Sequence, residues 1–594
     1  MQRIYVMSAA TVVLVIAALA AGFGLSTGWA VKALQDEALA RLGRTLTIKD
    51  GVSLEFSPRL VLRFEGVELG NPDGFEGAFV RARSLRIPVS LADILQRRIA
   101  GRFELEAPEI SLEVNLRGDV SWAGPGKGPA LPISESFVVE NGTVRFYDQR
   151  NQQSIIVSKA RLMISLSPEG ELTADGNAML GGRLSGITAY IKDVGRVAET
   201  GSPFDLSIAA PPLKAAFNGR LSTRGALNLA GKLALDGPSL RETAQWINMP
   251  IPGARGLGQF SISGTLDSQG IDFTLNNAAV ALDGLSASGD VGVTASRLAP
   301  LVFAKLALPA LELDAFVASP DIAANGWSEE ALSYEGLRGL NARMTLAVEQ
   351  LSLGSMAAGA SNIEASLAEG RLSVVIASDD LAGGRGRIDL ELDGSSQAPL
   401  FSARLVAQQA EAQTLLKQFT GQGWLSGRAD ADIAISGFGT SVAAIIATLK
   451  GAATFKVAQG VISGLDGPAL VASVTQRIAD GWGTPESSTP FESFGGSLTI
   501  SDGIAETADL KLEGANFAAE ASGQVDVLRR AIDLSVLPSV SSGLSGKMVG
   551  LPVPVVVKGA WGTPRIYPDI ADILLKPDEG FARLKQLGLP ASGN

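Results

Sequence analysis

Ile-Asp-Leu-Glu-Leu-Asp-Gly occupies positions 388 to 394 of this 594-residue chain. Apolar side chains alternate here with carboxylates. A strand with this pattern turns one face toward apolar surroundings and the other toward water. The Asp-Gly pair at its end tolerates the positive φ angles of a tight hairpin turn. The stretch therefore predicts a β-strand that ends in a turn.

The same two-residue alternation recurs along most of the chain, in short runs punctuated by glycine. It covers Val52 to Phe56, Phe103 to Ala107, Ile110 to Leu116, Leu227 to Leu229, Leu311 to Leu313 and Leu510 to Glu513. Further turn dipeptides are Asn141-Gly142, Asp236-Gly237, Asp283-Gly284 and Asp502-Gly503. The pattern predicts a mostly β protein built as a long run of antiparallel hairpins.

Helical patterns are few and short. A serine that can cap a helix precedes several of them. The predicted helices cover Ala30–Leu42, Ser90–Arg98, Ser239–Asn248, Glu411–Phe419, Ser441–Leu449, Pro468–Asp480 and Phe581–Leu587. Glycine-proline pairs within residues 124–132 predict a linker.

The N-terminal segment carries no charge between Arg3 and Lys32. About 20 helical residues at ~1.5 Å each span a hydrocarbon core of ~30 Å, so this run predicts a transmembrane helix. A cleaved signal peptide is the alternative, with Ala18-Leu19-Ala20 as its cleavage site. The uncharged run is longer than a usual signal core, and we expect a retained anchor with the body exported from the cytoplasm.

Composition excludes several classes of function. The chain contains no histidine and no cysteine, which removes His-based catalytic triads, thiolate chemistry and His or Cys metal sites. Its net charge of −11 disfavours a nucleic-acid partner. Hydrophobic residues make up 46% and charged residues 19%, so much apolar surface must be hidden or assigned to a ligand. We expect neither an enzyme nor a cofactor.

Short motifs at both ends resemble the AsmA family of Gram-negative envelope proteins, which includes larger TamB-like members. The N-terminal motifs are Leu42-Gly-Arg44, Val52 to Pro58, Leu60 to Pro72, Val89 to Leu95, Ala107 to Leu112 and Gly118 to Trp122. The C-terminal ones begin near Gly423 and include Leu449 to Ala453, Gly460 to Asp466, Gly495 to Ile500 and Val553 to Pro564, followed by Ile566 and Pro568. Residues 150–420 share only the strand rhythm.

This resemblance implies an elongated, curled antiparallel β-sheet, a β-taco groove, on a single-pass inner-membrane anchor, with the body in the periplasm of a Gram-negative bacterium. It also implies a fold similar to chorein-type bridge-like lipid-transfer proteins and a role in outer-membrane biogenesis. The expected segments are an anchor (1–31), an N-terminal β/α unit (32–123), a linker (124–132), a central β-groove (133–420), a C-terminal unit (421–570) and a tail (571–594).

Phospholipid carriage along the groove is the leading hypothesis, with phospholipid acyl chains, the inner membrane and envelope proteins at the C-terminal end as partners. The predicted groove residues are Leu54, Phe56, Leu62, Phe64, Leu105, Leu112, Val114, Leu116, Leu510 and Leu512. Ordinary sheet core is the structural alternative for this pattern. A non-transporting scaffold for outer-membrane proteins and a carboxylate-only glycan hydrolase are the alternative functions.

Overall fold

The computed structural model describes residues 28–569 and Leu575, apart from several gaps. The residues outside the description are 1–27, 57–59, 91–101, 118, 120, 122–134, 150–152, 198–199, 223–226, 248–250, 252–255, 295–299, 317–326, 333, 339–340, 396–397, 421–422, 466–486, 516, 542–547, 551–553, 562, 570–574 and 576–594. The described part forms two compact units: residues 1–247, 259–276 and 294–298 fall in unit 1, and residues 248–258, 277–293 and 299–594 in unit 2.

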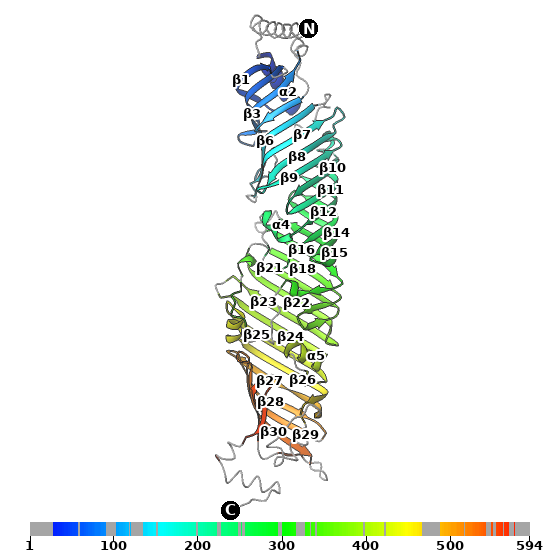
Figure 1. Cartoon of the computed structure of the whole chain (residues 1–594), viewed down its shortest axis with the longest axis vertical. Coiled ribbons are helices and arrows are strands. Elements are labelled where there is room, and N and C mark those ends of the chain that lie inside the picture. Colours follow the sequence, from blue (N-terminus) through cyan, green and yellow to red (C-terminus); the bar gives the residue numbers. More distant parts are fainter. Residues whose placement is uncertain are drawn as a thin grey trace, which may run out of the picture. The chain divides into compact units, whose positions relative to one another are not determined.

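Unit 1 is a ladder of strands that follow one another in chain order (Figure 1). Its elements are α2 (Gly28–Leu42), β1 (Leu46–Phe56), β2 (Leu60–Gly70), β3 (Ala78–Val89), β4 (Arg102–Glu106), β5 (Glu109–Val114), β6 (Glu135–Asp148), β7 (Gln153–Leu166), β8 (Leu172–Leu180), β9 (Arg183–Ile191), β10 (Ser202–Ala210), β11 (Leu213–Ser222), β12 (Asn228–Gly237), α4 (Leu240–Trp246) and β13 (Phe260–Gln269). From β6 to β13, each strand pairs antiparallel with the next. The strands β14 (Asp272–Leu282) and β15 (Leu285–Thr294) are divided between the units.

Unit 2 repeats this arrangement. Its main elements are β16 (Leu301–Leu308), β18 (Asn341–Val348), β21 (Ser361–Ala368), β22 (Arg371–Leu381), β23 (Gly384–Asp393), β24 (Leu400–Glu411), α5 (Ala412–Thr420), β25 (Arg428–Phe438), α6 (Val442–Ala447), β26 (Lys450–Ser463), β27 (Ser488–Ser501), β28 (Ile504–Glu513), β29 (Phe517–Asp526), β30 (Ala531–Ser541), β32 (Val555–Ala560) and β33 (Arg565–Pro568). Short strands β17 (Leu311–Glu312), β19 (Leu351–Leu353), β20 (Met356–Ala358) and β31 (Met548–Gly550) extend it. From β21 to β30, consecutive strands pair antiparallel.

The mostly β prediction is confirmed, and the described α-helices lie where the sequence predicts them, whereas the short 3-10 helices Val194–Arg196, Leu313–Ala315 and Glu335–Arg338 were not predicted. The residues of α2, α4, α5 and α6 fall within or beside the four ranges predicted for this part of the chain. Ser239 Oγ accepts a hydrogen bond from the Glu242 amide at 3.1 Å, and Ser441 Oγ accepts one from the Ala444 amide at 3.2 Å. These caps satisfy amides that the first helical turn leaves unpaired.

Several predictions fall on residues outside the description. These are most of the transmembrane run (1–27), the helices over 91–98, 468–480 and 581–587, and the linker at 124–132. Among the helices in the described part of the chain, none combines the length and hydropathy required to cross a bilayer.

The expectation of a purely antiparallel sheet is wrong at four places. β4 and β5 both pair parallel with β6, β16 pairs parallel with β18, and β17 pairs parallel with β19. Parallel neighbours need a long crossover instead of a hairpin. Long connections provide these crossovers, between Val114 and Glu135 and between Leu308 and Asn341.

The predicted turn dipeptides divide into several structural roles. Asp283-Gly284 and Asp502-Gly503 have positive φ at both residues and join β14 to β15 and β27 to β28, as predicted. Asn141-Gly142 instead lies inside β6, where the pairing with β7 shifts register. Asn141 has a φ of 57° there, so the pair forms a β-bulge and the prediction of a turn is wrong. Bulges of this kind increase the local twist of a sheet.

The remaining dipeptides also differ from a two-residue hairpin. Asp236-Gly237 leads into α4 rather than into a neighbouring strand. Asp393-Gly394 begins a longer connection between β23 and β24. An Asp-Gly pair marks the end of a strand in both cases, whereas the element that follows depends on the residues after it.

Gly176 provides a test of the close strand spacing in unit 1. Its φ is +152°, and a Cβ at this position would lie 2.0 Å from the carbonyl oxygen of Arg161 on β7. We expect Gly176→Ala to lower the free energy of unfolding by about 1–3 kcal/mol, because the side chain forces the strands apart. Hydrogen exchange of β7 and β8 in the full chain measures this loss.

Gly186 on the adjacent strand β9 is the matched control. The nearest atoms to a Cβ there lie 3.9 Å away, which is ordinary contact. Gly186→Ala should leave exchange unchanged or slow it slightly. Equal exchange rates in the two variants would contradict the assigned backbone geometry.

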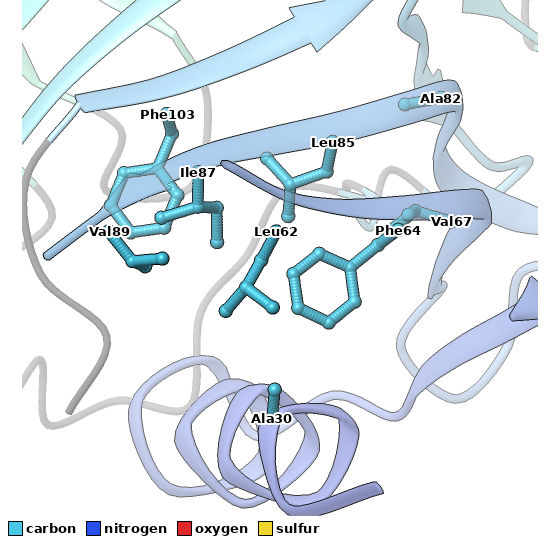
Figure 2. Close-up of a cluster of buried hydrophobic side chains, with 9 residues drawn as sticks. All are labelled: Ala30, Leu62, Phe64, Val67, Ala82, Leu85, Ile87, Val89 and Phe103. Carbon is cyan, nitrogen blue, oxygen red and sulfur yellow. The ribbon is translucent and has the colours of Figure 1, made fainter. Parts of the chain in front are cut away.

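Helix α2 covers the sheet at the β1–β3 end of unit 1. Figure 2 shows Ala30 of this helix facing Leu62 and Phe64. Ala30 and Phe64 are fully buried, and Leu62 is 2% exposed. Trp29, Val31 and Leu34 of the helix pack against the same cluster. The helix predicted as a continuation of the anchor is therefore part of the folded core of unit 1.

Candidate functional site

The strand register of unit 2 gathers apolar side chains on one face of its sheet. Leu390 on β23 lies opposite Val374 on β22 and Ala403 on β24. Cross-strand partners lie on the same side of a sheet. The apolar face of unit 2 consists of Val302, Ala304, Leu306, Ala342, Met344, Leu346, Ile363, Ala365, Leu367, Leu372, Val374, Ile376, Ile388, Leu390, Leu392, Phe401, Ala403, Leu405, Ile433, Ile435, Ala453, Phe455, Leu498 and Ile500.

Unit 1 has an apolar face of the same kind. Leu105 lies opposite Leu85 on β3 and pairs in register with Val139 on β6. Following the register onward gives the apolar face of unit 1: Leu54, Leu62, Phe64, Leu85, Ile87, Leu105, Phe137, Val139, Leu162, Ile164, Ala174, Ile187, Ala189, Leu206, Ile208, Ala215, Phe217, Leu233, Leu235 and Ile262.

These apolar faces lack full cover over most of their length. On β22 to β25, every member of the unit 2 face is partly exposed, and neither β12 nor β23 contains a fully buried residue. Interior strands of a two-layer domain normally bury such side chains completely. The described residues of both units therefore leave an apolar surface that protein packing covers incompletely, and we call it the half-covered surface.

The opposite face of the unit 2 sheet carries the charged side chains. Arg404 forms an ion pair with Asp432 at 2.7 Å, and Arg387 forms one with Asp389 at the same distance. The hydrogen bond from Arg404 lowers the pKa of the Asp432 carboxyl and raises the pKa of the Arg404 guanidinium. Both groups remain ionised at neutral pH, so this polar face is suited to water.

Clusters of buried side chains close parts of the apolar faces, among them one around Val139 in unit 1. The α2 cluster closes the β1–β3 end of unit 1. In unit 2, Ala412 and Leu416 of α5 pack with Val457, Phe491 and other side chains of β25 to β29. Another cluster buries Leu308, Val348 and Ile363 beside the short strands. In unit 2, the half-covered surface of β23 and β24 lies between the last two of these clusters in the order of the strands.

The structure divides the predicted groove residues of unit 1. Leu62 and Phe64 lie on the apolar face but are covered by α2, and Leu54 and Leu105 pack against that cluster. The side chain of Phe56 lies outside the description. The four described residues thus share the predicted face, but at its protein-covered end.

The predicted residues of β5 behave differently from one another. Leu112 is partly exposed and Val114, the last residue of the strand, is 5% exposed. Leu116 is 75% exposed in a turn, because the Asn115 side chain accepts hydrogen bonds from the Arg117 and Asp119 amides and ends the strand. Leu116 therefore does not continue the alternation, and its assignment to the strand face is wrong.

Leu510 and Leu512 both lie on β28 of unit 2. Leu512 is 5% exposed within the α5 cluster. Leu510 is partly exposed and lies against Gly496 of β27. A Cβ added at Gly496 would lie 2.8 Å from Cδ2 of Leu510. Both lie in the C-terminal part of the ladder rather than in its half-covered centre.

The central positions of the half-covered surface were not among the predicted site residues. Ile388, Leu390 and Leu392 form the most regular alternating stretch of the chain, yet alternation alone does not show which strands lack a covering helix. A long run of strands without an intervening helix, from β21 to β24, is the sequence signal that could have located this region.

An open depression of about 940 Å³ lies on the polar face of unit 2. It is lined mainly by hydroxyl, amide and carboxylate side chains of β27 to β30, among them Ser497, Glu506, Gln524 and Asp533. The Asp509 carboxylate accepts hydrogen bonds from the Ser497 amide and hydroxyl, which lower the pKa of this carboxyl. Among the described residues there is no cluster of acidic side chains suited to a metal ion.

Comparison with known proteins supports the resemblance noted in the sequence. Residues 341–510, which run from β18 into β28, match the family model described as the AsmA family. The match includes the motifs from Leu449 to Ile500. It begins before Gly423, in strands where the sequence analysis found only the alternation of apolar and polar residues in common with the family. No curated protein matches the chain. The similarity to the AsmA family is thus confirmed for the central part of unit 2.

Proposed function

We propose that this protein, similar to the AsmA family over residues 341–510, supports outer-membrane biogenesis by carrying phospholipid acyl chains along its apolar faces. In this proposal the N-terminal segment anchors the chain in the inner membrane and the body lies in the periplasm. The activity is non-catalytic and needs no cofactor. Envelope proteins at the C-terminal end are proposed as further partners.

The half-covered apolar surface on β22 to β25 is the observation that supports this proposal most strongly. Each exposed CH₂ group of a lipid costs about 0.8 kcal/mol in water. A chain of roughly 16 carbons therefore gains something like 10 kcal/mol when an apolar protein surface shelters it. The same contact would cover side chains such as Leu390 and Leu405, which the protein leaves partly exposed.

The length of this surface suits an acyl chain. Strands lie ~4.8 Å apart, so the ladder from β22 to β25 extends roughly 15 Å across the strands. One leaflet of a bilayer core is about 15 Å thick, which is the approximate length of a lipid tail. A tail can therefore lie along the ladder without meeting a polar side chain. Since the sequence shows no nucleotide-binding motif, movement would be diffusive.

Mass spectrometry of lipids that remain with the purified full-length protein tests this function. We expect phospholipid to be retained after the detergent is exchanged for one that does not itself extract lipid from the protein. Protein without retained lipid, combined with crosslinks to outer-membrane proteins, would contradict carriage and favour the scaffold alternative.

The scaffold alternative has one structural observation in its favour. Among the described residues, β1 pairs only with β2, and β33 pairs only with β32. A strand with one free edge can accept a strand from another protein. Crosslinks that join β1 or β33 to other envelope proteins would support this role.

A further inference from the structure

One border of unit 2 is formed by turns that join its strands. Hydrogen bonds between backbone groups connect these turns: Gly394 donates to Gly370 at 3.0 Å, Gly503 donates to Leu449 at 3.0 Å, and Val527 donates to Gly503 at 2.9 Å. We call this border the turn rim, and it consists of residues 369–371, 393–395, 398–399, 439–450, 502–503 and 526–530. Helix α6 is part of it.

A segment of the connection between β17 and β18 runs along the turn rim. We call its described residues, 327–332 and 334–338, the strap. The Trp327 indole donates to the Val527 carbonyl at 2.9 Å, and the Arg338 guanidinium donates to the Gly394 carbonyl at 2.8 Å. The strap therefore reaches from the turn between β29 and β30 to the turn after β23.

The strap lies on the apolar side of the sheet. The hydrogen bond from Gly394 to Gly370 continues the pairing of β23 with β22 by one residue. A side chain at position 394 would therefore point to the same side as Leu392 of the apolar face. A Cβ there would lie 3.2 Å from Cδ1 of Leu337 and 3.3 Å from Cβ of Tyr334.

Helix α6 occupies a matching position at β25. Gly437 lies opposite Phe401 of the apolar face, and a Cβ at Gly437 would lie 3.2 Å from Cγ2 of Ile445. The Ala443 amide of α6 donates to the Ser328 carbonyl of the strap at 3.0 Å. The strap and α6 together therefore form a wall along one side of the half-covered surface of unit 2.

The opposite side of this surface is closed by α5, which follows β24 at its other end. That wall is held by packing, since Ala412 of α5 is 3% exposed and Val457 beneath it is 3% exposed. In the strap, by contrast, every side chain that the structure describes is partly or largely exposed. Segments with few buried contacts detach at a lower free energy than packed ones, so the strap is the side that opens more easily.

The Tyr334 hydroxyl weakens the attachment of the strap further. It is shielded from water and has no hydrogen-bond partner among the described residues. Burial also raises the pKa of Tyr334. A buried hydroxyl without a partner is destabilising, and detachment of the strap would return this group to water.

We propose that the strap is a movable side wall, which detaches from the turn rim to admit a lipid tail to the apolar face of unit 2 and then returns. This inference rests on the proposed acyl-chain carriage. A tail that enters beside the strap requires the breaking of a few exposed hydrogen bonds. Entry past α5 would instead expose the buried apolar side chains of that cluster to water.

A reversible disulfide between the strap and the turn rim tests this movement, because the chain has no cysteine of its own. Ala331 and Ser441 form an antiparallel bridge, and the Leu332 amide beside it donates to the Thr440 carbonyl at 2.8 Å. The bridged residues are thus a non-hydrogen-bonded pair, with Cα atoms ~4.5 Å apart, which a disulfide can span. In the variant Ala331→Cys with Ser441→Cys, oxidation locks the strap and reduction frees it.

Loading is measured with a phospholipid that has a photoreactive acyl chain. The lipid is added in vesicles to the reconstituted full chain, and adducts on unit 2 are quantified after increasing times. We expect oxidation of the double variant to slow loading at least tenfold and reduction of the same sample to restore the rate. The reduced form is the reference, since it also lacks the Ser441 cap of α6.

A second cysteine pair controls for disulfide formation itself. Ala209→Cys with Lys214→Cys joins exposed, directly opposed positions of β10 and β11 in unit 1. This variant should load lipid on unit 2 at the same rate when oxidised and when reduced.

A further variant loosens the strap instead of locking it. Trp327→Phe removes the N–H that bonds to Val527 but keeps an aromatic ring beside Arg530. Loading should become about two- to tenfold faster, because the attached strap loses one hydrogen bond. Trp424→Phe makes the same exchange outside the strap, at a residue that is 42% exposed, and should leave the rate unchanged.

The outcomes separate the two proposals. Equal loading rates in the oxidised and reduced forms would overturn the movable wall and leave carriage standing. Equal slowing of the unit 1 control would also overturn it, because the position of the disulfide would then be irrelevant. If no form of the protein, including the unaltered one, gave lipid adducts, acyl-chain carriage itself would be wrong.

Discussion

Leu390→Asp is expected to abolish lipid retention while leaving the protein folded. Leu390 lies in the middle of β23 on the apolar face and is partly exposed. Without lipid, an aspartate at this position keeps some contact with water, so the free energy of unfolding should fall by about 1–3 kcal/mol rather than by the larger loss expected at a fully buried site. With a lipid tail against it, the carboxylate would lose its water, which costs several kcal/mol.

Retained lipid, measured by mass spectrometry on the full chain, should therefore fall at least tenfold, since 1.4 kcal/mol corresponds to a factor of ten. Ser366→Asp on β21 is the matched control, because Ser366 is exposed on the polar face of the same ladder. It should retain lipid at the unaltered level. If Leu390→Asp instead unfolded unit 2, the apolar face would be ordinary sheet core and the transport proposal would be wrong.

Phe64→Ala is expected to have the largest effect on stability. Phe64 of β2 is fully buried beneath α2. Its replacement by alanine should lower the free energy of unfolding of the β1–β3 region by about 3–5 kcal/mol. A chain of two units need not unfold in a single transition. Hydrogen exchange is the suitable measurement, because it reports the stability of the β1–β3 region separately from the rest of the chain. Protection of β2 and β3 should fall by more than a hundredfold.

Leu116→Ala is the control for this experiment. Leu116 lies in an exposed turn, with 75% of its surface in contact with water. Shortening its side chain should therefore change the free energy of unfolding by less than about 0.5 kcal/mol. Similar exchange in the two variants would contradict the packing of α2 on the sheet.

The sequence predicted the strand character and the described α-helices because both are local properties. Alternation around Leu390 and serine caps at Ser239 and Ser441 need no knowledge of distant residues. The parallel pairings of β4, β5 and β16 were missed, since a crossover depends on which distant strands meet. Asn141-Gly142 was predicted as a turn and forms a bulge for a related reason, because a residue with positive φ is found in both structures.

The predicted groove residues coincide with the observed apolar face only in part. The alternating face contains Leu54, Leu62, Phe64 and Leu105, as the sequence indicated. Which part of that face remains uncovered depends on where α2 and α5 pack, and contacts of α5 with residues such as Phe491 are not encoded in strand periodicity. Leu116 failed because Asn115 ends its strand through side-chain hydrogen bonds.

Site-specific photocrosslinking at two adjacent residues tests the central claim most directly. A photoreactive residue is placed in the full chain at Leu390, on the apolar face, or at Glu391, on the polar face. The account predicts phospholipid adducts from position 390 and essentially none from position 391. Adducts at neither position, or equal amounts at both, would contradict a lipid-carrying apolar face.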